Sequence, residues 1–174
     1  FLITLGTISE HGVKIYLASL TDKLRQYIST LERLGAEFSV ASDSVFIRGK
    51  PLEGEEINME GMEEFLPFLL SISPAIKGNL WIRFLNADKD LLSGLIASLK
   101  ACNVEIHVSD RHIKILGKGI AEPSPLDSKG NDLLELCNIL LALCCEDVCM
   151  ISSHGGFQNI YPSLHRDLRR LGVK

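Results

Sequence analysis

The sequence predicts an α/β fold, or α+β by a stricter definition, made of repeated β-α-β-α-β-β units. The first observation behind this prediction is an internal repeat. Residues 31–49, LERLGAEFSVASDSVFIRG, align with residues 99–117, LKACNVEIHVSDRHIKILG, about 68 residues further along the chain. The second observation is that stretches with apolar residues at helical spacing are separated by short stretches in which apolar and polar residues alternate. Helices and strands are therefore expected to alternate along the chain.

Length and composition are those of one folded domain. The chain has 174 residues, of which 46% are hydrophobic, so it can bury a core and is not disordered. Its net charge of −4 offers no basic footprint for nucleic acid, and no apolar run is long enough to cross a bilayer. We expect a single lobe over residues 1–174, with neither nucleic acid nor a membrane as a partner.

The first unit is expected to begin with a strand at residues 11–19, followed by a helix at residues 22–35. Thr21 or Asp22 can cap the start of this helix, and Gly35 can end it. A helix is predicted here because apolar residues recur at helical spacing, at Leu24, Ile28, Leu31 and Leu34.

Alternating apolar and polar residues predict a hairpin with one buried face at residues 36–49, and its repeat at residues 104–116. Between them, a short extended stretch leads into an apolar helix at residues 63–78. Pro67 is tolerated in that helix only near the first turn, and Gly78 is expected to mark its end. The unit then starts again.

The rest of the chain repeats this order. We expect a strand at 79–85, a helix at 89–101, a Pro-rich loop at 119–130, a helix at 132–143 and a strand at 148–153. The repeat units then cover about residues 12–78 and 79–147, with a partial unit at 148–174. Gly172 stands one more period beyond Asn103, the position that matches Gly35. The third hairpin is missing because the chain stops at Lys174, so another segment must supply it or a sheet edge stays open.

Five cysteines gather mostly in the segment LCNILLALCCEDVC, at residues 136–149. Neither spaced pairs nor neighbouring histidines of the kind a zinc site uses are evident there, so we expect buried thiols and no metal. An odd number of cysteines without a signal peptide predicts a reducing cytoplasm. The apolar start, FLITLGTISEHG, is typical of a helix end, and we expect the chain to be a piece of a longer protein.

The order of these motifs resembles the enolpyruvyl transferases, and within them the EPSP synthase (3-phosphoshikimate 1-carboxyvinyltransferase) family. The shared features are a helix ending in Leu-Gly-Ala, then a hairpin carrying Asp and a final Ile-x-Gly, repeated near 68 residues. FLITLGTISEHGVKIYLASL and IYPSLHRDLRRLG are similar to the opening and closing segments of that family's C-terminal lobe. The resemblance covers nearly the whole chain. It implies an inside-out lobe, with helices gathered inside sheets, that borrows a strand segment from the start of a longer polypeptide.

The resemblance implies an activity, two substrates and a partner lobe. The family transfers the enolpyruvyl group of phosphoenolpyruvate to the 5-hydroxyl of shikimate 3-phosphate, releasing phosphate, in the pathway to chorismate and the aromatic amino acids. The reaction passes through a tetrahedral intermediate, and it uses neither a metal nor an organic cofactor. An N-terminal lobe completes the site between the two lobes. The related UDP-N-acetylglucosamine enolpyruvyl transferases fit less well, because their reactive Cys loop is not found here.

Residue by residue, the resemblance implies a partly retained site. Glu64 stands where the family has a catalytic Asp, and Lys89 with Asp90 fall on its Lys-Glu pair when counted forward from Gly78. When the register is instead counted back from the hairpin at residues 104–116, Asp88 falls on the Glu of the family's Lys-Glu pair. The expected roles are acid and base for Glu64 and Asp90, and substrate binding for Lys89. Arg83, on the preceding strand, is expected to reach the cleft between the lobes.

Several cations of the family's motifs are replaced. Its Arg after the Lys-Glu pair falls on Leu91 or Ser93, its Asp-His-Arg on residues 131–133 (Asn-Asp-Leu), and a Lys on Asn159. Guanidinium groups suit phosphate and carboxylate because they bind both through paired, charge-assisted hydrogen bonds. An alternative therefore stays open: a catalytically degenerate homologue that keeps the scaffold to bind another ligand or a protein partner.

Each candidate also has a purely structural interpretation. Glu64 can favour a helix N-terminus through the macrodipole, and Lys89 with Asp90 can simply occupy a first turn. Arg83 can face solvent from a half-buried sheet. The sequence leaves both interpretations open for all four residues.

Overall fold

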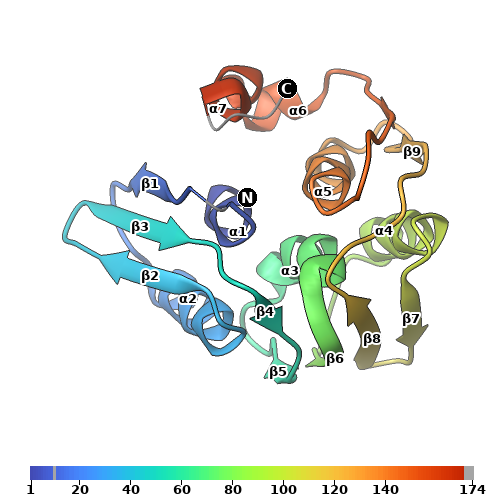
Figure 1. Cartoon of the computed structure of the whole chain (residues 1–174), viewed down its shortest axis with the longest axis horizontal. Helices are drawn as coiled ribbons and strands as arrows, with labels where there is room; N and C mark the ends of the chain where they lie inside the picture. The colour runs from blue at the N-terminus through green and yellow to red at the C-terminus, as the bar shows by residue number, and fades with distance from the viewer. Residues whose placement is uncertain (10, 171–174) are drawn as a thin grey trace.

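The computed structural model describes residues 1–9 and 11–170, and it has the alternation of helices and strands expected from the sequence (Figure 1). Gly172, the glycine of the third partial copy, lies outside the described residues. The helices are α1 (Leu2–Thr7), α2 (Asp22–Arg33), α3 (Leu66–Ile72), α4 (Lys89–Ala101), α5 (Asp132–Ala142), α6 (Phe157–Ile160) and α7 (Leu164–Arg170). Two 3₁₀ turns, η1 (Glu63–Phe65) and η2 (Ser73–Ala75), flank α3.

The strands form three sheets. In the first, β3 (Ser44–Arg48) lies between β1 (Val13–Tyr16) and β2 (Glu37–Val40), antiparallel to both. The second is the most complete. In it, β6 (Ile76–Arg83) pairs in parallel with β4 (Leu52–Glu53) and β5 (Glu56–Asn58), then antiparallel with β8 (His112–Lys118), whose other neighbour is β7 (Glu105–Val108). The third is the parallel pair β9 (Leu126–Asp127) and β10 (Ile151–Ser152).

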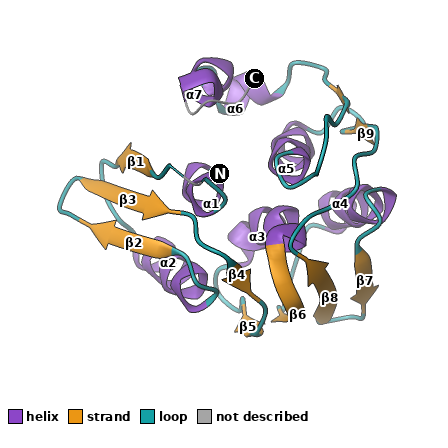
Figure 2. Ribbon diagram, viewed as in Figure 1, coloured by secondary structure: helices purple, strands orange, loops and turns teal. Residues whose placement is uncertain are grey.

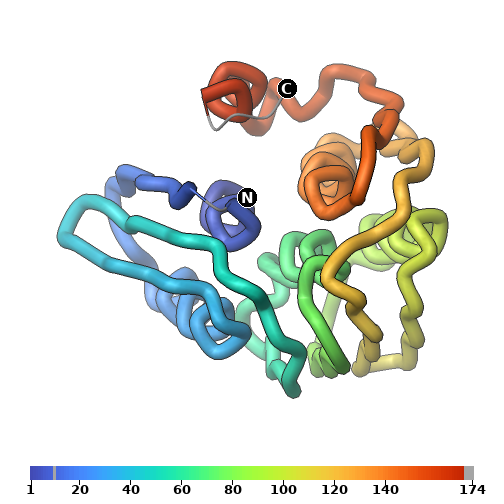
Figure 3. Tube along the Cα trace, viewed as in Figure 1, coloured from blue at the N-terminus to red at the C-terminus, as the bar shows by residue number. Residues whose placement is uncertain are grey.

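The chain runs around the molecule unit by unit, with the early residues on one side and the last ones above them (Figure 3). Helices α1, α3 and α5 lie towards the middle, and the strands of the first two sheets lie outside them (Figure 2). Leucines of α3 and α5 are fully buried, including Leu69, Leu70, Leu140 and Leu141. The predicted α/β fold of repeated units is therefore confirmed, with helices inside and sheets outside. Within the described ranges, every helix is too short or too polar to span a bilayer.

Backbone geometry repeats with the sequence. Gly35 has φ of +115°, and its counterpart Asn103 has φ of +56°, so in both units the helix before the hairpin, α2 or α4, ends through a left-handed residue. Asparagine tolerates this region better than other residues with a side chain. The amide of the next residue bonds a helix carbonyl in both units, Ala36 to Leu31 at 3.0 Å and Val104 to Leu99 at 3.0 Å. The same helix ending is thus used twice.

A second pair of equivalent glycines marks close backbone contact. A Cβ on Gly49 would lie 2.7 Å from the carbonyl oxygens of Thr7 and Ser9, just after α1. A Cβ on Gly117 would overlap the Ile76 carbonyl, just after α3 and η2. In each unit the last strand of the hairpin therefore crosses the C-terminal end of an inner helix at a distance that only glycine allows.

The predicted end of the α3 helix was wrong. Helix α3 ends at Ile72 because Pro74 follows and is accommodated in the 3₁₀ turn η2, and β6 begins at Ile76. Gly78 lies inside that strand, with φ of +85°, opposite Gly117 of β8. The strands predicted at residues 11–19 and 148–153 are also shorter than expected.

The cap of α2 is Thr21, whose side chain accepts a hydrogen bond from the Leu24 amide at 3.3 Å.

Candidate functional site

The topology brings three of the four sequence-predicted site residues to one edge. Because β5 and β6 are parallel, with Asn58 opposite Arg83, their carboxyl ends lie together. Helix α3 follows β5 and α4 follows β6, so both helices begin at this end. We call it the helix-start edge, and it carries Glu64, Lys89 and Asp90. Loops that follow the carboxyl ends of parallel strands commonly hold ligands in α/β proteins.

Glu64 lies in the turn η1 and faces the start of α2. Its Oε2 lies 3.1 Å from Nζ of Lys23, and both side chains are about half exposed, at 49% and 57%. Phe65, the next residue, stacks on the buried ring of Tyr27 with ring centroids 4.6 Å apart. This stacking holds η1 against α2, so the first turn of α2 also belongs to the helix-start edge. An exposed pair of this kind leaves both charges available to a ligand.

Glu63 connects the same turn to the loop before α4, a role that the sequence did not reveal. Its carboxylate accepts hydrogen bonds from the amides of Gly61 at 3.0 Å and Leu85 at 3.3 Å. Burial acts to raise the pKa of Glu63, but these backbone N–H bonds outweigh it and hold the pKa below its usual range. Glu63 is thus a charged clamp between η1 and the end of β6.

We expect Glu63→Gln to destabilise the protein only where this carboxylate is ionised. A group whose pKa is lower in the folded state stabilises it above the unfolded pKa of about 4.3, and the contribution is lost as pH falls through the folded value. Urea unfolding of the wild type and the variant should therefore differ at pH 7, and the difference should shrink as the pH falls through the lowered pKa of Glu63 in the folded protein. A difference in stability that stays constant across that range would contradict the clamp.

Lys89 and Asp90 open α4, and both are exposed. The cap of this helix is Asp88, whose Oδ1 accepts hydrogen bonds from the amides of Asp90 and Leu91, both at 3.0 Å. Asp88 is thereby held by the backbone, whereas the side chains of Lys89 and Asp90 project from the first turn. The N-terminus of α4 also favours an anion beside Lys89.

We expect Asp88→Ala to lower the free energy of unfolding by about 1 kcal/mol, because two amides at the start of α4 would lose their acceptor. Asp88→Asn keeps a capping oxygen and serves as the matched control, with a loss of a few tenths of a kcal/mol at most. Chemical denaturation of the three proteins measures both differences. Equal losses in the two variants would show that Asp88 acts by charge and not as a cap.

Arg83 is the last residue of β6, but its side chain does not face the helix-start edge. Its neighbours Ile82 and Phe84 are buried, so Arg83 is on the outer face of the sheet, with Trp81. Its Nε lies 3.4 Å from Oε1 of Glu60. A hollow of about 290 Å³ beside it is lined by Glu56, Trp81, Ile82, Arg83 and His112. The structure therefore does not bring Arg83 together with Glu64.

The positions where the resemblance implies arginines are Leu91 or Ser93, and Leu133; Ser93 is exposed, whereas the two leucines are packed. Leu91 is 5% exposed, and Leu133 is partly buried against the core. At the start of α5, Nδ2 of Asn159 lies 3.5 Å from Oδ2 of Asp132, so these two replaced positions contact each other. The cations that face this edge from the described part of the chain include Lys23 and Lys89. A doubly charged phosphate and a carboxylate would need further cations to be well bound.

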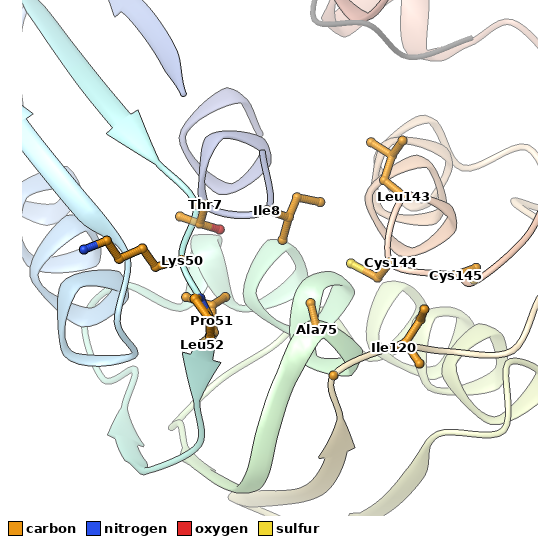
Figure 4. A pocket seen from close by; sticks show the side chains of 12 residues that line it. Thr7, Ile8, Lys50, Pro51, Leu52, Ala75, Ile120, Leu143, Cys144 and Cys145 are labelled. Carbon is orange, nitrogen blue, oxygen red and sulfur yellow. The ribbon is translucent and has the colours of Figure 1, made fainter. Parts of the chain in front are cut away.

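A second hollow, of about 330 Å³, lies at the opposite ends of the inner helices (Figure 4). Its lining includes Thr7 and Ile8 at the end of α1, Ala75 after α3, and Leu143 after α5. Helix C-termini carry partial negative charge, which disfavours anions such as phosphate or carboxylate. This hollow is therefore a poor site for anionic substrates, although its lining includes Lys50.

The cysteines are only in part the inert buried thiols expected from the sequence. Cys137 and Cys144 are buried, and burial raises the pKa of each thiol to about 12. Cys102 is buried as well, but Cys145 and Cys149 are partly exposed and lie beside it. The sequence did not predict that these three would meet.

Comparisons with known proteins agree with the fold and the order of motifs. No protein-family model matches the chain. The 3-phosphoshikimate 1-carboxyvinyltransferase of Korarchaeum cryptofilum (strain OPF8) is 24% identical over 178 residues, a match that covers 96% of this chain and 41% of that protein. The enzyme of the same name from Shewanella sp. (strain W3-18-1) is 21% identical over 121 residues, covering 67% and 28%. The chain thus spans about two fifths of the first relative's length.

Solved structures that superpose on the chain are also enolpyruvyl transferases. EPSP synthase from Acinetobacter baumannii superposes with a TM-score of 0.81 at 14% identity, covering 97% of this chain and 43% of that one. The enolpyruvyl transferase NikO from Streptomyces tendae superposes with a TM-score of 0.76 at 18% identity, covering 99% and 42%. The chain therefore has the fold of a single enolpyruvyl transferase lobe. Within that class, its curated relatives are EPSP synthases, as the motifs implied.

Proposed function

We propose that the chain supplies one lobe, of the C-terminal type, of a 3-phosphoshikimate 1-carboxyvinyltransferase-like enzyme. The reaction joins the enolpyruvyl group of phosphoenolpyruvate to the 5-hydroxyl of shikimate 3-phosphate and releases phosphate. The cytoplasm and the pathway to aromatic amino acids are part of the same proposal. The observation that carries it is the position of Glu64, Lys89 and Asp90 at one edge of a lobe with this fold.

In this proposal the carboxylates move the protons. The shikimate hydroxyl adds to C2 of phosphoenolpyruvate as it loses its proton, and C3 gains a proton, which gives a tetrahedral intermediate. Loss of phosphate from C2 and of a proton from C3 then restores the double bond. Glu64 and Asp90 are the general acid and base for these transfers, a role worth about 10²- to 10⁴-fold in rate. Lys89, at the N-terminus of α4, holds an anionic group of the substrate.

An N-terminal lobe is part of the proposed enzyme, because the helix-start edge carries few cations. Leu91 or Ser93, and Leu133, stand where guanidinium groups would otherwise face the anions. Residues of the other lobe, across the cleft, would then bind these anions instead. The 174-residue chain alone is therefore expected not to turn over.

Isothermal calorimetry on the longest natural form of the polypeptide tests the proposal. Shikimate 3-phosphate is expected to bind with 1:1 stoichiometry, and phosphoenolpyruvate is expected to bind more tightly once it is present. Lys89→Met should weaken binding of at least one of them, whereas Lys118→Met, on the exposed end of β8, should not. Absence of heat from both substrates at millimolar concentration would contradict the proposal.

A catalytically degenerate homologue, acting as a binding or scaffold module, is the second candidate. The observation that favours it is the contact between Asp132 and Asn159, where two polar side chains partner each other and neither is a cation that could bind a substrate anion. This candidate predicts binding of neither substrate, or binding of shikimate 3-phosphate without release of phosphate from phosphoenolpyruvate.

A further inference from the structure

Three cysteine sulfurs meet at the ends of α4 and α5, away from the helix-start edge. Cys102 caps the C-terminus of α4, Cys145 follows α5, and Cys149 lies in the loop beyond it. No two of the three Sγ atoms are more than 4.8 Å apart, and those of Cys145 and Cys149 are 3.8 Å apart. All five cysteines are free thiols.

The backbone around the three cysteines holds them in place. The segment after β8 passes between the two helix ends: the amide of Glu122 bonds the Cys102 carbonyl at 3.2 Å, and Ala121 bonds the Cys144 carbonyl at 2.9 Å. Ala121 also forms a parallel bridge with Cys145. The three sulfurs therefore come from separate segments that are already joined by hydrogen bonds. A site with this support would need little rearrangement to bind an ion.

The surroundings of the sulfurs favour a cation. Both α4 and α5 direct their C-terminal, partially negative ends towards this point. The amide of Ser124 donates a hydrogen bond to Sγ of Cys149 at 3.4 Å, and such a bond stabilises a thiolate. Cys145 and Cys149 are partly exposed, and Cys145 also lines the hollow of Figure 4, so an ion has a path to the sulfurs.

We propose that Cys102, Cys145 and Cys149 form a three-thiolate site for a thiophilic d¹⁰ cation, Zn²⁺, with a fourth position open to solvent. A zinc–sulfur bond of about 2.3 Å in tetrahedral geometry separates two sulfurs by about 3.8 Å. The Cys145–Cys149 pair already has this separation. On binding, each of the three thiols releases its proton to solvent and forms a bond to the metal, so the cluster becomes a charged, metal-bound centre.

The site lies where the second unit meets the partial third one. Cys102 and Cys145 follow α4 and α5 of the second unit, and Cys149 lies just beyond that unit, at the start of the partial third one. A bound ion would join the C-terminal ends of α4 and α5 where the third sheet is only the short pair β9 and β10. The site would therefore stabilise this part of the lobe whether or not the transferase reaction takes place.

Titration of the reduced, metal-free protein with Cd²⁺ tests the site, because cadmium thiolates absorb in the ultraviolet. The expected result is saturation at one equivalent, with the band displaced by excess Zn²⁺, and a thermal midpoint that rises with added Zn²⁺. Cys149→Ser should lower the band by about a third and weaken binding by more than about tenfold, since even changes to the neighbours of metal ligands cost about 10- to 100-fold. Cys137→Ala, whose thiol lies outside the cluster, should leave both unchanged.

Three results would overturn the proposal: no charge-transfer band, a band of equal size in the triple serine variant of the cluster, or a protein that forms a Cys145–Cys149 disulfide and fails to bind Cd²⁺ after reduction. Circular dichroism of each variant checks that it folds. The wild-type titration needs no variant, so it decides the matter even if a substitution unfolds the chain.

Discussion

Gly117→Ala is expected to destabilise the protein by about 3 kcal/mol or more, enough to unfold a marginal domain. A methyl group at this position would overlap the Ile76 carbonyl and lie 2.9 Å from that of Ser73. Both obstacles are backbone, so relief requires β8 to move away from the end of α3. That movement would disturb the pairing of β6 with β8, which extends from Lys77–Lys118 to Arg83–His112. Urea unfolding measures the change.

Gly78→Ala is the matched control for this prediction. Gly78 is the direct partner of Gly117 across the two strands, and nothing lies within 4 Å of where its Cβ would be. Its φ of +85° makes alanine strained, at a cost of about 1–2 kcal/mol. If Gly117→Ala were no more destabilising than Gly78→Ala, the close crossing of strand and helix end would not be what requires glycine.

Glu64→Gln is expected to lower kcat of the longest natural form by about 10²- to 10⁴-fold, the usual contribution of a general acid or base. Glutamine keeps the size and the hydrogen-bonding oxygen of the side chain but cannot carry the proton. Because Glu64 is about half exposed and pairs only with Lys23 in the described residues, the loss of the ion pair should cost less than about 1 kcal/mol of stability. Steady-state kinetics and denaturation together separate the two effects.

Glu37→Gln controls for the loss of a surface ion pair, since Glu37 pairs with Lys50 on the first sheet, away from the helix-start edge. It should leave kcat unchanged. If Glu64→Gln behaved in the same way, Glu64 would be a residue that only favours its helix N-terminus, and its assignment as a catalytic residue would fail.

Much of the fold could be predicted because equivalent positions in the two copies of the repeat share a backbone conformation as well as a type of residue. The left-handed residue is Gly35 after α2 and Asn103 after α4, two residue types that tolerate the same conformation. Gly78 misled the prediction because a glycine after an apolar helix is usually a C-terminal signal. Here Pro74 had already ended the helix, and the glycine serves inside a strand.

The shared edge of the candidate site could be predicted, because the order of strands and helices along the chain determines where its residues lie in the fold. Glu64, Lys89 and Asp90 precede or begin helices that follow parallel strands, so their common edge follows from the topology. The outer position of Arg83 also followed from strand alternation, because Ile82 and Phe84 take the inner positions. Glu63 could not be foreseen, since its partners are backbone amides from two separate loops.

The cysteine cluster was missed for a related reason. Contrary to the expectation from the sequence, Cys145 and Cys149 do have a spacing that metal sites use, with three residues between them, but two ligands alone are too few to predict a site. The third, Cys102, comes from the end of α4, much earlier in the chain, and only the folded structure brings it near.

The most direct test of the central claim is release of phosphate from phosphoenolpyruvate in the presence of shikimate 3-phosphate, measured on the longest natural form beside the 174-residue chain. We expect the long form to release phosphate with equimolar formation of the enolpyruvyl ether, the short chain to release none, and Glu64→Gln to suppress the reaction. Release by neither form, with no binding of either substrate, would contradict the transferase assignment and leave a repeated scaffold with another use.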